Sequence, residues 1–314
     1  MTRRLTVRIP GSTANLGPGF DTLALALSIY TEITFELVDK PDGSAPVVTL
    51  SGGVEGKLPA GADNLVYQVL AGRWRERSDL MERLRIKIRS DIPLGAGLGS
   101  SGTAILAAVW ASFALADREP DRDRVLSYGT AIEGHPDNIA ASLNGGLVVC
   151  SPSADGRRIV SRRLSWPDEW HTLVVVPQYS VTTHQARKVL PRHVSLSDAV
   201  ANVQRTALLV SAVAGHDEAA LSEALHDRLH EPYRSELFPE LPALRRVLAY
   251  KPAIGCVLSG AGPSVLVIVR DRHKAAVREE VEAWAKAQDK PPRLLDLKVD
   301  KEGLRASHGG NGTA

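Results

Sequence analysis

Cysteine is scarce in this chain, which has only Cys150 and Cys256 among its 314 residues. Two cysteines do not build the disulfide framework that stabilises small secreted domains. Each lies in an apolar, strand-like run, so we expect both to be reduced residues of the core. This scarcity argues against a secreted disulfide scaffold.

Long hydrophobic runs and an excess of one charge are also missing. No segment approaches the roughly 18 consecutive apolar residues that a membrane span needs, and the N-terminal residues do not form the apolar block of a signal peptide. With 38 basic and 36 acidic residues, the net charge is +2. A broad field that would attract a nucleic acid is therefore not expected. We predict a cytoplasmic globular protein, with no nucleic acid or membrane as partner.

What the chain does contain is a glycine-rich loop. Alternating apolar and basic residues predict a strand over residues 84–89, and an apolar run predicts a helix over residues 103–115. Between them lie three alternating glycines and two serines: Gly95, Gly97, Gly99, Ser100 and Ser101. Glycine permits positive φ, and free backbone N–H groups before a helix attract anions. The loop therefore predicts a phosphate site, in which the serines either cap the helix or offer hydroxyl groups to a ligand.

The loop by itself leaves the kind of site open. It is not a Walker A loop, because no lysine follows the glycines. Residues 97–102 match the dinucleotide pattern G-x-G-x-x-G, but the basic face of the preceding strand is unusual for a buried parallel strand. A glycine-rich turn without a ligand is the remaining alternative.

Three other segments place polar residues beside irregular backbone. Residues 10–21 hold three glycines and two prolines, so we expect no regular structure there. Residues 133–138 span the start of a short helix, which we expect to begin at Pro136. Thr183 and Arg187 lie one turn apart in another expected helix and would reach one anion together. Capping or plain exposure would explain each of these patterns as well.

Two long helices are expected over residues 196–214 and 217–229. His226 and His230 lie four residues apart in the second, which is the spacing of zinc ligands on a helix. The glutamate of H-E-x-x-H is missing, since Asp227 follows His226, and no third ligand is evident. We therefore predict no metal site at this pair.

Several of these segments, in order from residue 10 to residue 264, resemble the GHMP kinases. The loop P-L-G-A-G-L-G-S-S-G-T is similar to their ATP loop, with Gly102 where alanine is usual, and S-G-A-G-P-S at residues 259–264 to their third motif. The segments S-T-A-N-L-G-P-G-F-D and E-G-H-P-D-N resemble the homoserine kinases more closely than other members, as does H-E-P-Y-R at residues 230–234. The segment around Arg187 also fits the homoserine kinase pattern S-T-x-x-A-R-x-x-L-P, except that Val181-Thr182 stands where the pattern has its serine.

The resemblance implies a two-domain α+β fold, with ATP and substrate bound between the halves. It implies an N-terminal ATP-binding domain over residues 1–160 and a ferredoxin-like C-terminal domain over residues 161–305. We expect residues 306–314 to be a disordered tail. A homodimer is left open.

The implied reaction is ATP-dependent phosphorylation of L-homoserine to O-phospho-L-homoserine, a step of threonine biosynthesis. Two alternatives stay open, another GHMP small-molecule kinase and a non-catalytic binding protein of the same fold. A zwitterionic substrate needs cations for its carboxylate and anions for its ammonium group. Mevalonate or galactose would not require both.

The resemblance also implies roles for individual residues. ATP would be bound by Asn64, Thr183 and the loop residues Pro93, Leu94, Gly95, Ala96, Gly97, Leu98, Gly99, Ser100, Ser101, Gly102 and Thr103. Mg²⁺ would be held by Ser101 and Glu133. The substrate would be bound by Asn15, Asp21, His135, Asp137, Arg187, Arg234 and Gly260. Asn138 would orient the reacting hydroxyl without a dedicated base, and Arg187 would neutralise charge on the moving phosphoryl group.

Overall fold

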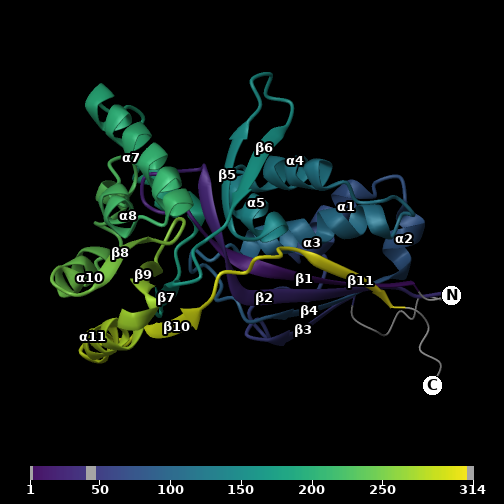
Figure 1. Ribbon diagram of the computed structural model, residues 1–314. Helices are drawn as coiled ribbons and strands as arrows, with labels where there is room; N and C mark the ends of the chain where they lie inside the picture. The colour runs from purple at the N-terminus through teal and green to yellow at the C-terminus, as the bar shows by residue number, and fades with distance from the viewer. Residues whose placement is uncertain (1–2, 40–46, 310–314) are drawn as a thin grey trace.

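The N-terminal half contains a seven-stranded sheet, on which its helices pack (Figure 1). The structure is a computed structural model, and it describes residues 3–39 and 47–309. Five strands pair in the order β11-β1-β2-β4-β3, while β5 pairs with β2 and β6 with β5. The bounds are β1 (Arg3–Ala14), β2 (Leu23–Leu37), β3 (Val48–Gly52), β4 (Leu84–Ser90), β5 (Leu147–Pro152), β6 (Ile159–Leu164) and β11 (Arg305–Gly309).

Helices cover one face of this sheet and enclose its apolar core. Helices α3 and α5 contact the sheet, and α1 and α4 pack against α3 (Figure 1). Because α3 is covered by the sheet and by other helices, it is apolar on most sides rather than along one stripe. The helices of this half are α1 (Leu65–Arg73), α2 (Ser78–Arg83), α3 (Ser100–Ala114), α4 (Arg122–Glu133) and α5 (Asp137–Asn144).

The C-terminal half has a four-stranded antiparallel sheet in the order β10-β7-β9-β8. Numbered along the chain, these strands lie in the order 4-1-3-2 with helices in the two crossovers, which confirms the predicted ferredoxin-like topology. The strands are β7 (Trp170–Val176), β8 (Ala253–Leu258), β9 (Val265–Arg270) and β10 (Arg293–Leu297). The helices are α6 (Thr183–Lys188), α7 (Leu196–Gly215), α8 (Glu218–Ala224), α9 (Glu231–Arg234), α10 (Glu240–Leu248) and α11 (Lys274–Lys286).

The prediction of irregular structure from residue 10 onward is wrong for its first five residues. Strand β1 continues through Pro10 to Ala14, with a shift of register between Pro10 and Gly11. A bulge at this point accommodates a residue that has no N–H group for the ladder. The expected helix over residues 217–229 is also too long, because α8 ends at Ala224 and a turn around Asp227 follows it.

The predicted tail is wrong for residues 306–309, which belong to strand β11. This strand pairs with the edge of β1, for example Thr6 with Ser307, so its backbone groups replace water at that edge. Its side chains alternate weakly in polarity, which is why the sequence did not indicate a strand. Residues 310–314 lie outside the described residues. At the other boundary, β6 remains in the first sheet up to Leu164, four residues past the predicted end of the N-terminal domain.

Both cysteines are buried and free, which confirms the prediction from the sequence. Burial raises the pKa of the Cys256 thiol to about 12 and also raises that of Cys150, so both stay protonated near neutral pH. Within residues 3–39 and 47–309, no helix is both long and apolar enough for a membrane span.

Candidate active site

A cavity of about 390 Å³ is lined by the glycine loop, the start of α1, the Glu133–Asn138 segment, α6 and Arg234. The loop has φ of +62°, +75° and +71° at Gly95, Gly97 and Gly99, a region of φ that favours glycine. At Gly97 a Cβ atom would lie 2.2 Å from the carbonyl oxygen of Ser259, so only glycine lets the loop approach the third motif. The Ser259 hydroxyl donates to the Gly97 carbonyl at 2.8 Å, which fixes this approach.

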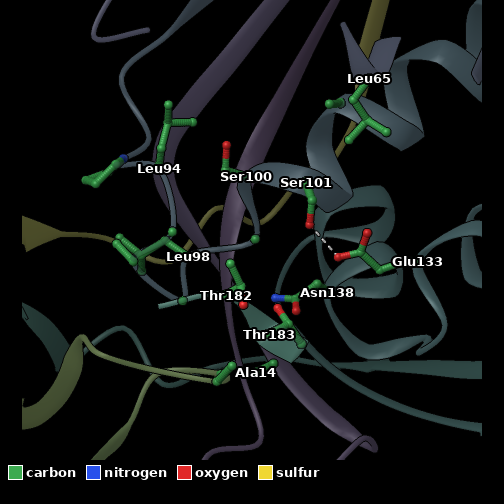
Figure 2. Close-up of a pocket in the computed structure, with 18 of the residues that line it drawn as sticks. Ala14, Leu65, Leu94, Leu98, Ser100, Ser101, Glu133, Asn138, Thr182 and Thr183 are labelled. Carbon is green, nitrogen blue, oxygen red and sulfur yellow. Dashed lines mark hydrogen bonds between the residues drawn. The ribbon is translucent and has the colours of Figure 1, made fainter. Parts of the chain in front are cut away.

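The loop serines do not cap helix α3. The N-cap is Gly99 in the left-handed conformation, and it makes no side-chain capping bond. Ser101 instead donates a hydrogen bond of 2.6 Å from Oγ to Oε1 of Glu133, at the end of α4 (Figure 2). A hydroxyl and a carboxylate therefore meet at the wall of the cavity, and both offer oxygen ligands.

Asn64 lines the cavity, but its side chain makes hydrogen bonds within the protein. Its Oδ1 accepts from the backbone N–H of Val66 and caps α1, and its Nδ2 donates to the carbonyl oxygen of Pro59 at 2.8 Å. The side chain is only 2% exposed. It shapes this end of the cavity while its polar atoms are already paired.

At the other end of the cavity, Asp21 and Arg187 form a two-point ion pair. Nη2 of Arg187 lies 2.6 Å from Oδ1 of Asp21, and Nη1 lies 3.1 Å from Oδ2. The backbone N–H of Asp21 donates to Oδ1 of Asn15, whose Nδ2 donates to the carbonyl oxygen of Gly260. Thr183 is the first residue of α6 and Arg187 lies one turn later, as predicted. The pair joins segments that are 166 residues apart.

His135 and Asp137 form a second close pair beside the first. Nδ1 of His135 lies 2.7 Å from Oδ1 of Asp137, and this oxygen also accepts from the backbone N–H of Asn138. Burial lowers the pKa of His135, but the hydrogen bond and charge of Asp137, together with the charges of Glu133 and Asp21, outweigh burial, so the pKa is raised overall. Ligand atoms of Asp21, His135 and Asp137 lie within 4.8 Å of one another, so this end brings two carboxylates close together.

Arg234 is buried at 1% exposure and forms no ion pair within the described part of the chain. Its Nε donates to the carbonyl oxygen of Ala186 at 3.1 Å, and its Nη1 donates to His230 and to the carbonyl oxygen of Gly260, both at 3.2 Å. No acceptor among the described residues is paired with Nη2. Burial and the neighbouring charge of Arg187 lower its pKa to about 10, which still leaves the guanidinium charged at neutral pH. This buried cation on the cavity wall thus has no anionic partner within residues 3–39 and 47–309.

Asn138 lies between the phosphate loop and Asp137, because a Cβ atom at Gly99 would lie 3.1 Å from its Nδ2 and its backbone N–H donates to Oδ1 of Asp137. Its Nδ2 donates to Oγ of Ser12 at 3.0 Å, and its backbone packs in the first turn of α5. Its Oδ1 has no partner among the described residues. An acceptor oxygen is therefore available at the point where the two ends of the cavity meet.

Comparison with known proteins assigns the family. The model for the GHMP kinases N terminal domain matches residues 64–146, and the model for the GHMP kinases C terminal matches residues 209–287. The homoserine kinase of Caldanaerobacter subterraneus is 38% identical over 299 residues, which cover 95% of this chain and 94% of the relative. That of Moorella thermoacetica is 36% identical over 266 residues, or 85% of this chain and 88% of the relative. The chain belongs to the homoserine kinase family.

Solved structures agree with this membership. The crystal structure of homoserine kinase from Cytophaga hutchinsonii matches with a TM-score of 0.82 and 26% identity, over 97% of both chains. The mevalonate diphosphate decarboxylase of Enterococcus faecalis matches with a TM-score of 0.70 at 15% identity, which shows a shared fold alone. As a member of the homoserine kinase family, the chain is an ATP-dependent kinase with the predicted two-domain GHMP architecture.

Sequence reasoning missed two residues that shape the site of this kinase. Ser12 holds the amide of Asn138, and Phe20 lies with its ring centre 5.4 Å from the Arg187 guanidinium and 5.5 Å from that of Arg234. Both belong to the S-T-A-N-L-G-P-G-F-D segment, so the resemblance was the available signal. The histidine pair of residues 226 and 230 holds no shared site, since His226 is exposed and His230 is buried against Arg234.

Proposed function

We propose that this chain transfers the γ-phosphoryl group of ATP to the side-chain hydroxyl of L-homoserine. The observation that carries the proposal is the charge pattern at one end of the cavity. Arg234 is a buried cation without an anionic partner among the described residues, and beside it Arg187 and Asp21 neutralise each other. A zwitterionic amino acid supplies a carboxylate for the guanidinium groups and an ammonium group for Asp21 and Asp137. A neutral polyol supplies neither.

Phosphate binding is assigned to the glycine loop in this proposal. Positive φ at its three glycines and the N-terminus of the 15-residue helix α3 suit an anion. Thr183, on the facing wall, would contribute a hydroxyl. The residues Gly95–Ser101 would hold the phosphates, while Asn64 and Leu65 would form the base end of the cavity.

The residues present also fit Mg²⁺, which kinases of this family would need. Ser101 and Glu133 present adjacent oxygen ligands, and Mg²⁺ takes one or two protein oxygens together with phosphates and water. The ion would neutralise charge on the phosphates as the phosphoryl group moves. The cluster of Asp21, His135 and Asp137 is a weaker choice for the ion. The Asp21 carboxylate is already paired with Arg187, and Asp137 is paired with His135.

The proposed chemistry depends on positioning rather than on a general base. Asp21 is paired with Arg187, and would be paired with the substrate ammonium group once Arg187 shifts, while Asp137 is paired with His135, so neither carboxylate would be free to take the hydroxyl proton. The unpaired Oδ1 of Asn138 would accept a hydrogen bond from the substrate hydroxyl and aim its oxygen at the phosphoryl group. In a loose transition state the hydroxyl keeps its proton until late, so orientation is the main requirement. Arg187 would shift from Asp21 toward the incoming anions.

The test is ADP release with a set of alcohols that differ by one charged group. L-Homoserine carries both charges, 4-hydroxybutyrate lacks the ammonium group, and 3-amino-1-propanol lacks the carboxylate. We expect efficient turnover with L-homoserine only, because each analogue leaves buried charges of the site unpaired. Faster turnover of either analogue, or of mevalonate or galactose, would contradict the assignment. The homodimer and the cytoplasmic location stay predictions, and sedimentation of the purified chain tests the first.

A further inference from the structure

His230 is a fully buried imidazole directly behind Arg234. Its exposed fraction is 0%, and its ring stacks on Phe20 with 5.1 Å between ring centres and 25° between planes. Nε2 lies 2.8 Å from the carbonyl oxygen of Gly17, and Nδ1 lies 3.2 Å from Nη1 of Arg234. Both ring nitrogens are therefore used, one toward the N-terminal loop and one toward the guanidinium.

These two contacts determine the tautomer. A carbonyl oxygen only accepts, so Nε2 carries the proton, and a guanidinium only donates, so Nδ1 offers its lone pair. The ring is then neutral with its proton on Nε2. Oδ2 of Asp227 lies 3.7 Å from Nε2, beyond hydrogen-bond distance, and is held by the backbone N–H groups of His230 and Glu231. The geometry leaves no place for a second ring proton, because it would face Arg234.

We propose that His230 is a positioning residue that aims the Arg234 guanidinium at the amino-acid end of the cavity. Ala186 and Gly260 hold Nε and Nη1 through carbonyl oxygens, and His230 supplies the only side-chain acceptor in this set. Together the three acceptors engage Nε and Nη1 and leave Nη2 for a ligand carboxylate. Without Nδ1, the guanidinium loses one of the bonds that prevent it from turning. The inference rests on the proposed function, in which Arg234 binds the substrate carboxylate.

Two substitutions separate the two ring nitrogens. His230→Asn keeps an acceptor close to the position of Nδ1 and loses the donor toward Gly17. His230→Gln keeps a donor close to the position of Nε2 and loses the acceptor toward Arg234. Both remove the ring that stacks on Phe20, so each controls for lost packing in the other. We expect His230→Gln to raise the homoserine KM about 10-fold and His230→Asn to raise it less than about threefold, with little change in the ATP KM.

A coupled variant tests whether the effect passes through Arg234. In an Arg234→Ala background, His230→Gln should add less than about twofold to the homoserine KM, because the group that it positions is gone. A full 10-fold effect in that background would overturn the proposal, and so would an equal or larger KM effect of His230→Asn than of His230→Gln. The first result would mean that His230 acts independently of Arg234, and the second would place its role in the Gly17 contact.

A spectroscopic measurement tests the same inference without turnover. In wild-type protein labelled with ¹⁵N-histidine, the buried ring should show a protonated Nε2 and an unprotonated Nδ1 at pH 7. The reverse tautomer or a doubly protonated ring would overturn the assignment. If wild type shows no homoserine-dependent ADP release while the ring has the expected tautomer, the proposed function has failed and the geometry of His230 has not.

Discussion

The two ends of the cavity are built in different ways. At the phosphate end, one stretch of seven residues, Gly95–Ser101, provides most of the proposed contacts through its backbone. At the amino-acid end, the charged side chains come from the segment after β1, the start of α5, α6 and α9, and all of them except Arg234 are already paired with one another. Backbone N–H groups of one short loop can bind phosphate without side chains from other segments. The paired side chains of the other end, in contrast, fit only a ligand with a matching arrangement of charges. The difference suggests a division of labour, with phosphoryl transfer at the first end and recognition at the second.

Glu133→Gln tests this division most strongly. We expect kcat to fall at least about 100-fold, because a neutral amide is a weaker ligand where several kcal/mol of charge stabilisation is needed. The homoserine KM should change less than about threefold. Steady-state kinetics across a Mg²⁺ titration measures both, and Asp123→Asn, on the exposed face of the same helix, is the matched control. A kcat close to wild type at saturating Mg²⁺ would contradict the role of Glu133.

Arg234→Ala should show the opposite pattern. Loss of one charge-assisted contact costs about 1.5–3 kcal/mol, so the homoserine KM should rise roughly 10- to 150-fold while the ATP KM stays near its wild-type value. Arg246→Ala removes an exposed arginine of α10 and serves as the control. Because Arg234 is buried, thermal denaturation must first show that the variant folds. An equal rise of the homoserine KM and the ATP KM would contradict the separation of the cavity into a phosphate end and an amino-acid end.

Two glycines of the phosphate loop offer a sharper comparison within one end. At Gly97 a Cβ atom would meet the Ser259 carbonyl at 2.2 Å and the backbone has φ of +75°, so Gly97→Ala should destabilise the fold by more than about 2 kcal/mol and raise the ATP KM. At Gly102, on the helical side, the nearest atoms lie at 3.5 Å. Gly102→Ala should therefore be tolerated and stabilise α3 by about 0.5–1 kcal/mol. Urea denaturation gives both values, and a stable Gly97→Ala variant would show that the loop does not need this approach.

The smallest effect concerns His135 and pH. Its folded-state pKa is raised above the ordinary value of 6.5, since the hydrogen bond to Asp137 and the nearby carboxylate charges together outweigh burial. The charged pair therefore contributes stability that is fully present below about pH 6.5 and is lost as the pH rises through the folded-state pKa. His135→Gln should lower the melting temperature most at acidic pH, and the difference from wild type should shrink toward pH 8. A constant difference across this range would mean that folding does not shift the pKa of His135.

The sequence alone indicated most of the local structure of the site. Alternation along residues 84–89, the three glycines and the apolar run after Ser101 predicted a strand, a loop and a helix, and β4 and α3 confirm them. Such patterns are readable because each depends on neighbours within about one turn or one strand. The resemblance of the motifs then predicted the family and the ferredoxin-like half, which the topology confirms.

Only the tertiary structure decided how the charges at the amino-acid end are paired. Nothing in the spacing of Asp21, Arg187 and Arg234 says that the first two neutralise each other and that the third is buried without a carboxylate. The same holds for β11, whose pairing with β1 joins residues about 300 positions apart, and for His230, whose contact with Arg234 the sequence did not indicate. The physical reason is the separation along the chain between the residues that interact. A turn or a helix start is determined by a few consecutive residues, whereas an ion pair between distant segments depends on how two sheets and their helices pack.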